Sequence, residues 1–340
     1  MLSYIVKRLL LSVLTIVMIS FITFVIIKLP PGDYANYYYH ANDMHAAHTS
    51  SYAGDDADEV MRQLREELGL NRPLIIQWWD WFSGIVFRWD FGNSYTGSNT
   101  GATPNLVLIS SVLPATILIA IFTMVITWTL SIPIGIYSAM RQHSIGDYIF
   151  TSVGFAGLAV PDFLLGLVLM YLFFAYFDHS VGGLFSAEYL DVPWSMGRFI
   201  DLLEHLIIPG IVMGTAGTAG LIRIMRNNLL DELGKPYVVT ALAKGKNSWK
   251  VVIKYPFRVA INPLISSIGY MIPALISGTV IVSIVLSLPT LGPELVAALM
   301  RENMTLAGSI ILMLGVLTVV GTLISDLLLI VVDPRIRMAE

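Results

Sequence analysis

The chain has 340 residues, of which 56% are hydrophobic and 13% are charged. An ordinary soluble domain carries about 25% charged residues, so this composition indicates a membrane protein. The net charge of −4 provides no basic footprint for nucleic acid. The absence of cysteine excludes disulfides, thiolate metal sites and a cysteine nucleophile.

Apolar segments recur along the chain at lengths that suit membrane helices. A bilayer core about 30 Å thick requires roughly 20 mostly apolar helical residues. The candidates are residues 9–27, 106–140, 149–177, 206–222, 264–288 and 306–332. The sequence therefore predicts an all-α polytopic membrane protein with six transmembrane helices.

The first segment, residues 1–30, is interpreted as an uncleaved transmembrane helix. A signal peptide would also begin with basic residues such as Lys7 and Arg8, but the apolar stretch is long and no small-x-small cleavage site follows closely. Basic residues near a span remain on the cytoplasmic side. With the amino terminus inside, the inner segments hold Lys7, Arg8, Arg141, Arg223, Arg226, Lys235, Lys244, Lys246, Lys250, Lys254, Arg258, Arg335 and Arg337. Both termini of this inner-membrane protein are then expected to be cytoplasmic.

Residues 31–105 form the one segment with the composition of a small soluble module, and we expect them outside the cell membrane. Asp56 to Glu59 fits a capping box that opens an amphipathic helix. Val60, Leu64 and Leu68 would share one face of that helix, and Gly69 would end it. An extracytoplasmic segment with short helices follows from this pattern.

Four tryptophans, Trp78, Trp79, Trp81 and Trp89, lie close together in the same segment. Tryptophan favours the membrane–water boundary, so an interfacial belt is the preferred interpretation. An aromatic platform that stacks on a sugar ring is the alternative.

His40, Asp43, His45 and His48 also lie close together in the outer segment. Imidazole and carboxylate groups can bind a transition metal. The surrounding residues are polar and rich in turn formers, so a solvated loop without a metal is the preferred interpretation.

Prolines interrupt several of the apolar segments. The segment 106–140 is too long for one upright span, and Pro114 and Pro133 predict bends because proline removes a helix hydrogen bond. Pro161 predicts a break within 149–177. The fourth candidate, 206–222, is short and is expected to begin near Pro209.

Two carboxylates, Asp162 and Asp326, fall within the apolar segments. A carboxylate in hydrocarbon is costly and usually faces a bundle interior or a water-filled cavity. Asp162 is therefore a candidate for the transport pathway, whereas a packing or capping role is expected for Asp326.

Gly210, Gly214, Gly217 and Gly220 recur at spacings of three and four in the fourth segment. Small residues allow close approach of membrane helices, so we expect a packing face. The sequence contains no G-x-x-x-x-G-K-[ST] phosphate loop, no H-E-x-x-H and no G-x-S-x-G. A catalytic centre and a nucleotide site are thus not predicted in this chain.

Residues 228–263 form a basic, amphipathic loop between two apolar segments. From residue 235 to residue 263 the loop contains six basic residues and no acidic one, and small residues lie at Ala241, Ala243 and Gly245. A loop that only connects two membrane helices does not require this arrangement of basic and small residues. The arrangement therefore suggests a docking surface.

The loop reads Thr-Ala-x-Ala-Lys-Gly over residues 240–245 and Ile-Asn-Pro over 261–263. It resembles the cytoplasmic coupling loop, or EAA loop, of binding-protein-dependent ABC import permeases. Seven further segments resemble segments of such permeases and follow one another in the same order as in that family. They are YIVKRLL, LPPGDY, ELGLNRPLIIQWWDWFSG, DFGNSY, SIPIGIYSA, LSLPTLGPEL and DPRIR. Together they are similar to B-type permeases of the dipeptide, oligopeptide and nickel group, including an oligosaccharide-associated subgroup.

This resemblance implies a type I ABC importer-like permease fold with a small extracytoplasmic insertion after helix 1. A permease core over residues 106–334 would include the coupling loop 228–263, and a cytoplasmic tail would cover 335–340. The residues matching the coupling pattern are Tyr237, Thr240, Ala241, Ala243, Lys244 and Gly245.

The resemblance also implies partners. These are a second homologous permease subunit, two ATPase subunits that carry ATP and magnesium, and an extracytoplasmic substrate-binding protein. The chain itself would be a non-enzymatic transport subunit without a cofactor, and its cargo would be oligopeptides or oligosaccharides. A nickel importer of the same family and a secondary transporter without an ATPase remain alternatives.

Two departures from the family pattern lie in the loop. Leu242 stands where many members carry arginine, and Tyr255-Pro256 replaces a common histidine-alanine pair. Pro256 is expected to break the second short helix of the loop.

Overall fold

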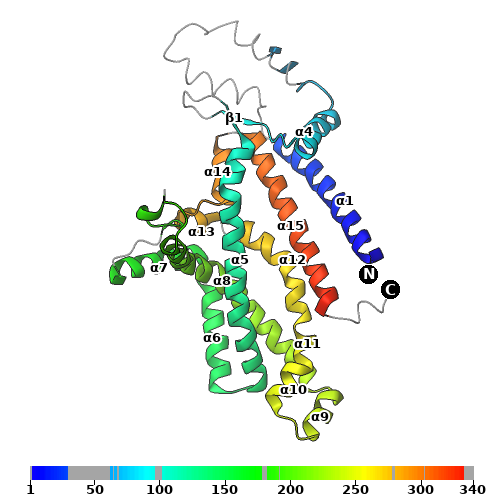
Figure 1. Ribbon diagram of the computed structural model, residues 1–340, viewed down its shortest axis with the longest axis vertical. Helices are drawn as coiled ribbons and strands as arrows, with labels where there is room; N and C mark the ends of the chain where they lie inside the picture. The colour runs from blue at the N-terminus through cyan, green and yellow to red at the C-terminus, as the bar shows by residue number, and fades with distance from the viewer. Residues whose placement is uncertain are drawn as a thin grey trace. The chain divides into compact units, whose positions relative to one another are not determined.

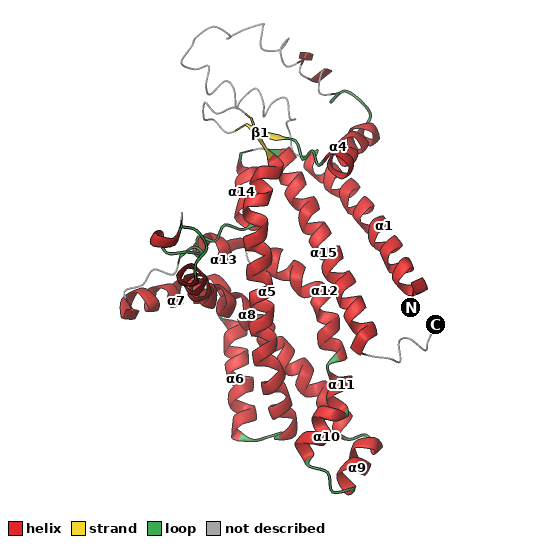
Figure 2. Cartoon of the chain, in the orientation of Figure 1, coloured by secondary structure: helices red, strands yellow, loops and turns green. Residues whose placement is uncertain are grey.

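A computed structural model describes residues 2–29, 62–63, 65–66, 69–95, 102–177, 182–190, 192–277, 280–301 and 303–332. In these ranges the chain is predominantly helical, with one two-stranded antiparallel sheet (Figures 1 and 2). The elements are α1 (Leu2–Ile27), α4 (Leu74–Arg88), β1 (Asn93–Tyr95), β2 (Ala102–Pro104), α5 (Asn105–Met140), α6 (Ile145–Ala159), α7 (Asp162–Phe177), η1 (Ala187–Tyr189), α8 (Met196–Leu233), α9 (Pro236–Ala243), α10 (Ser248–Lys254), α11 (Pro256–Ala260), α12 (Asn262–Ser277), α13 (Val280–Val285), α14 (Leu291–Met300) and α15 (Met304–Val332).

The chain divides into two compact units. Unit 1 comprises Met1–Leu9, Ala115–Pro289 and Leu317–Glu340, and unit 2 comprises Leu10–Pro114 and Thr290–Val316. Three long helices, α1, α5 and α15, begin in one unit and end in the other.

Four described helices, α1, α5, α8 and α15, are long and apolar enough to cross a membrane. The pair α6 and α7 passes the same test together and bends by 102°, which raises the number to five if the pair is one span. The bend confirms the break predicted at Pro161, since α6 ends at Ala159 and α7 begins at Asp162. Helix α5 continues unbroken through Pro114 and Pro133.

The fourth span differs from its prediction. A short helix beginning near Pro209 was expected, but α8 has 38 residues and contains Pro209 in its interior. Membrane helices tolerate proline where neighbouring helices pack around it, and Pro209 is buried. Helix α8 therefore continues through Pro209, contrary to the local proline rule.

The fifth predicted span, 264–288, is divided between two described helices. Helix α12 has 16 residues and α13 has six, and residues 278–279 between them lie outside the described residues. Neither helix alone reaches the length of a span. The described residues therefore account for fewer spans than the six predicted.

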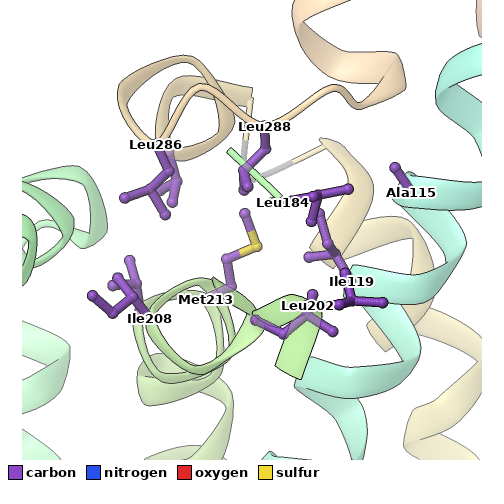
Figure 3. Packing of buried hydrophobic residues seen from close by; sticks show 11 residues of the cluster. Ala115, Ile119, Leu184, Leu202, Ile208, Met213, Leu286 and Leu288 are labelled. Carbon is purple, nitrogen blue, oxygen red and sulfur yellow. The ribbon is translucent and has the colours of Figure 1, made fainter. Parts of the chain in front are cut away.

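The main core of unit 1 surrounds the first half of α8 (Figure 3). Leu202, Leu206, Ile208, Val212 and Met213 of α8 pack with buried residues of α5, of the segment 182–190 and of α13 with its following turn. These other residues are Ala115, Ile119, Leu184, Val282, Leu286 and Leu288. The backbone N–H of Gly183 also donates to the carbonyl of Leu286 at 2.8 Å, so the segment 182–190 is fixed to α13.

The glycine face predicted on α8 lies against α5. A Cβ at Gly210 would stand 2.6 Å from Ile126, and one at Gly214 would stand 2.9 Å from Thr127. Glycine is thus required there for the close approach of the two helices. Gly217 also lies beside Thr127, whereas a Cβ at Gly220 would meet open space.

In unit 2, helix α4 packs on α1 through Trp78. The indole Nε1 donates to Ser20 Oγ at 3.1 Å, and the ring meets Phe21 edge-on and stacks on Phe82. Trp78 is only 9% exposed, so its ring lies inside the protein, whereas Trp79 and Trp89 are exposed. The interfacial position of these tryptophans stays a prediction.

The outer segment is described only in part. Residues 62–63 and 65–66 are helical, and Gly69, with φ of 65°, ends this turn through hydrogen bonds from Gly69 N to Glu66 O and from Leu70 N to Arg65 O. The predicted helix stop is confirmed. The predicted capping box at 56–59 and the His40, Asp43, His45 and His48 group lie outside the described residues.

Candidate functional site

The segment between α8 and α12 folds into three short helices, α9, α10 and α11. A residue suited to a helix start stands at the beginning of each one. Pro236 is the first residue of α9, and Pro256 is the first residue of α11. Asn247 caps α10, because its side-chain oxygen accepts a hydrogen bond from Trp249 N at 3.0 Å. The helix is interrupted at Tyr255, between α10 and α11, so the interruption predicted at Pro256 is confirmed.

Gly245 turns the chain from α9 toward α10. Its φ is 74°, a conformation that costs a residue with a Cβ about 1 to 2 kcal/mol, and its N–H donates to Leu242 O at 2.9 Å. A Cβ at Gly245 would meet no atom within 4 Å. Backbone conformation, and not internal crowding, therefore explains this glycine.

The inner face of the loop is a small apolar core. Val238, Ala241 and Val251 are buried together, with Leu233 and Tyr255 packed against them. The alanine of the coupling pattern at position 241 thus stabilises the fold of the loop itself.

The outer face of α9 is exposed and partly apolar. Val239 and Leu242 are exposed and lie three residues apart, so they share one face of the helix. Tyr237 is exposed nearby, and its hydroxyl donates to Glu232 Oε2. Thr240 is exposed as well, with its hydroxyl donating to Pro236 O at 2.8 Å.

Three of the predicted coupling residues, Ala243, Lys244 and Gly245, also lie exposed at the end of α9. Val239 was missed by the motif comparison, and Leu242 was noted only as a departure. The spacing of these two apolar residues on a basic helix is the signal that could have identified them.

Lysines surround Tyr255 between α10 and α11. Lys246 Nζ donates to the Tyr255 hydroxyl at 3.4 Å, and the ammonium groups of Lys246 and Lys254 lie 5.8 and 5.6 Å from the ring centroid. The hydrogen bond from Lys246, followed by the positive charges of Lys246 and Lys254, lowers the pKa of Tyr255. Positive charge is therefore concentrated around Tyr255.

The loop is joined firmly to the long helices of unit 1. Val252 of α10 and Ala260 of α11 belong to one buried cluster with Ile136 of α5, Met225 of α8 and Leu264 of α12. Figure 1 shows the three short helices together at the end of α5 and α8. Because close-packed interiors transmit displacement, a force on the loop acts directly on these helices.

Asp162 is the first residue of α7, directly after the 102° bend, and is partly buried. A carboxylate at a helix N-terminus interacts favourably with the helix dipole. Within the described ranges, no basic side chain forms an ion pair with it.

Asp326, the second intramembrane carboxylate, has a basic partner. Its Oδ2 lies 3.1 Å from Arg8 Nη1, which joins the first turns of α1 to α15 within unit 1. The packing role expected for Asp326 is in accord with this ion pair.

A third carboxylate was missed by sequence reasoning. Asp147 near the start of α6 is 4% exposed and accepts two hydrogen bonds from Arg226 of α8. These residues are 79 positions apart, so no local pattern could pair them.

A metal site is not found in the part of the chain that the structure describes: no group of three or more histidine and acidic side chains has a suitable arrangement there. The described helices of spanning length define a polytopic membrane protein, and a loop of three short helices follows one of them, α8.

Comparisons with known proteins specify its family. Residues 131–338 match the family described as binding-protein-dependent transport system inner membrane component, and residues 1–132 match the N-terminal domain of such components. The chain is 34% identical to the oligopeptide transport system permease protein AppB of Bacillus subtilis, over 99% of this chain and 100% of that protein. It is 30% identical to a probable peptide ABC transporter permease protein, y4tP, of Sinorhizobium fredii, over 98% and 99% of the two chains. A putative peptide permease protein of Brucella ovis is also 30% identical, over 99% and 100%.

The chain belongs to the family of binding-protein-dependent inner membrane transport components. It is thus a multi-pass permease subunit of a binding-protein-dependent ABC importer.

Proposed function

We propose that this permease imports oligopeptides, driven by ATP that separate ATPase subunits bind with magnesium and hydrolyse. The names of the relatives support a peptide cargo, because each of the three is named as an oligopeptide or peptide permease. An extracytoplasmic binding protein would deliver the peptide, and a second homologous permease subunit would complete the pathway. Oligosaccharides remain the comparison cargo in the experiment below.

The proposed contact with the ATPase is the exposed face of α9, formed by Tyr237, Val239, Thr240, Leu242 and Ala243. The observation that carries this proposal is the division of the loop into two faces: one face of α9 is exposed, while Val252 and Ala260 are buried against α5, α8 and α12. An apolar helix face fits a groove on a partner. Lys244 and Gly245 would complete the contact at the end of the helix.

Movement of α9 by the ATPase would then pass to α10 through Val238, Ala241 and Val251, and from α10 and α11 to α5 and α8 through the buried cluster that they share. ATP shifts the ATPase toward the conformation that binds ATP more tightly. The permease, which contacts the ATPase through α9, would change conformation together with it. Asp162 is proposed to line the pathway, supported by its partial burial at the bend and by the lack of an ion pair among the described residues.

The proposed membrane arrangement has six spans, with α12 and α13 together as the fifth, and a type I importer-like fold. The loop 228–263, the tail 335–340 and both termini would be cytoplasmic, and residues 31–105 would be extracytoplasmic after the first helix 1–30. The permease core is proposed to extend over 106–334. The basic residues of the loop support this orientation.

The test is uptake into proteoliposomes by the purified complex of permease, ATPase and binding protein, with labelled oligopeptides and labelled oligosaccharides offered in parallel. Leu242→Asp should abolish ATP-dependent peptide uptake while the complex still binds peptide. Ile253→Asp, the same change at an exposed position on α10, is the matched control and should retain uptake. Uptake by the permease without the ATPase would overturn the proposal in favour of a secondary transporter.

A further inference from the structure

A pocket of about 380 Å³ lies between α6 and the second half of α8, the half that leads to the short-helix loop. The residues from α6 and the preceding turn run from His143 to Leu158, and those from α8 run from Ala219 to Asn227. The α6 wall from Asp147 to Leu158 is about 16 Å long at 1.5 Å per residue. The pocket is therefore elongated along the helices.

The lining changes from polar to apolar along this length. His143, Tyr148, Arg223 and Asn227 lie toward the loop end of the helices. Phe155 and Leu158, farther along α6, provide apolar wall, and Gly154 allows close contact there because a Cβ would stand 3.3 Å from Ala219. The pocket is thus amphipathic, with one polar and one apolar end.

The arginine and aspartate side chains at the polar end carry a net charge of +1. Asp147 and Arg226 neutralise each other through two hydrogen bonds. Arg223 is exposed on the pocket wall, and no carboxylate among the described residues forms an ion pair with it. A ligand with one negative charge would compensate Arg223, and an apolar chain would cover Phe155 and Leu158.

We propose that this pocket holds one anionic phospholipid, with its phosphate at Arg223 and Asn227 and an acyl chain along Phe155 and Leu158. Basic pockets between membrane helices on the cytoplasmic side bind lipid headgroups. In the orientation proposed above, the lipid belongs to the inner leaflet. It would occupy the junction of α6 and α8, and α8 leads directly to the coupling loop.

The experiment is native mass spectrometry of the full permease complex, released from detergent with added phosphatidylglycerol or phosphatidylethanolamine. One phosphatidylglycerol per permease chain should remain bound, in preference to phosphatidylethanolamine. Arg223→Gln should weaken this binding about fivefold, which corresponds to the loss of about 1 kcal/mol per basic residue. Thr151→Trp, which fills the pocket from an exposed position on α6, should abolish it.

The matched control is Arg141→Gln, at an exposed arginine just after α5 that does not line the pocket. It should leave phosphatidylglycerol binding unchanged. Equal binding by wild type and Arg223→Gln overturns the proposal, and so does displacement of the lipid by glycerol phosphate, which would indicate a site for a soluble anion. Because the chain has no cysteine, Tyr148→Cys provides a unique thiol, and its cross-linking to the second permease subunit would show that protein and not lipid covers the pocket.

Discussion

Arg226 of α8 holds Asp147 of α6 with a bidentate pair of hydrogen bonds, Nε to Oδ1 at 3.0 Å and Nη2 to Oδ2 at 2.9 Å. The same carboxylate accepts the backbone N–H of His143 at 3.0 Å, so the turn before α6 is fixed by the same group. One acidic side chain thus links the turn before α6 to α8.

Breaking this pair should destabilise the permease. Arg226→Met leaves a nearly buried carboxylate without its counter-charge, and we expect a loss of about 3 to 5 kcal/mol in the free energy of unfolding. The double variant Asp147→Leu with Arg226→Met should recover part of that loss. Thermal unfolding in detergent measures both, and additive effects in this double-mutant cycle would contradict the expected coupling.

Close approach of α5 and α8 at Gly210 should not tolerate a side chain. Gly210→Leu places atoms against Phe122 and Ile126, and overpacking of this kind costs about 1 to 3 kcal/mol. Gly220→Leu on the same helix meets open space and serves as the control. Melting temperatures of the two variants should differ clearly, and equal values would show that the helices separate without cost.

The turn at Gly245 should be sensitive to any Cβ. Gly245→Ala is expected to destabilise the loop locally by about 1 kcal/mol, because φ of 74° is unfavourable for alanine. Hydrogen exchange of the α9 amides should accelerate about fivefold in this variant. Gly234→Ala, at a φ of −78° and also in open space, should leave the exchange unchanged. Unchanged protection in Gly245→Ala would show that the turn does not limit opening of α9.

Tyr255 should ionise below its usual pKa of 10.0, because Lys246 donates a hydrogen bond to it and Lys246 and Lys254 add positive charge. Between the lowered pKa and 10.0 the unfolded chain binds more protons, so this group stabilises the loop increasingly as pH rises through that interval and contributes nothing at lower pH. The ultraviolet difference between wild type and Tyr255→Phe isolates this phenol. Lys246→Met should raise its titration midpoint, Lys250→Met should not, and identical midpoints would refute the assignment.

Trp78 should be the critical tryptophan of α4. Trp78→Ala removes a buried ring and its hydrogen bond to Ser20, which we expect to cost about 3 to 5 kcal/mol. Trp79→Ala, at a residue 52% exposed, should change stability by less than about 0.5 kcal/mol. Denaturation of each variant provides the comparison, and a small effect at Trp78 would show that α4 does not depend on α1 in unit 2.

Sequence reasoning identified most features that depend on local chemistry. The apolar segments, the break at Pro161, the glycine face of α8 and the interruption at Pro256 follow from hydropathy, backbone sterics and side-chain size. The local proline rule was wrong at Pro209, which lies buried in the interior of α8. The contact of Trp78 with Ser20 of α1 could not be read from a local pattern, because the two residues are far apart in the chain.

The candidate site was predicted in outline. The motif located the loop, but it did not separate residues that stabilise the loop from residues that face outward. Ala241 belongs to the first kind, and Val239 and Leu242 belong to the second. The pair Asp147 and Arg226 could not be predicted, because contacts between distant positions depend on how the helices pack.

The burial of Val238, Ala241 and Val251 within the loop separates two kinds of evolutionary constraint. Substitutions at these positions alter the shape of the loop, whereas substitutions at Val239 and Leu242 alter only the exposed surface of α9. In the contact proposed for α9, the outward residues could therefore diverge together with a partner ATPase while the scaffold of the loop remains constant. Exchange of a few side chains on one helix face would then direct a related permease to a different ATPase.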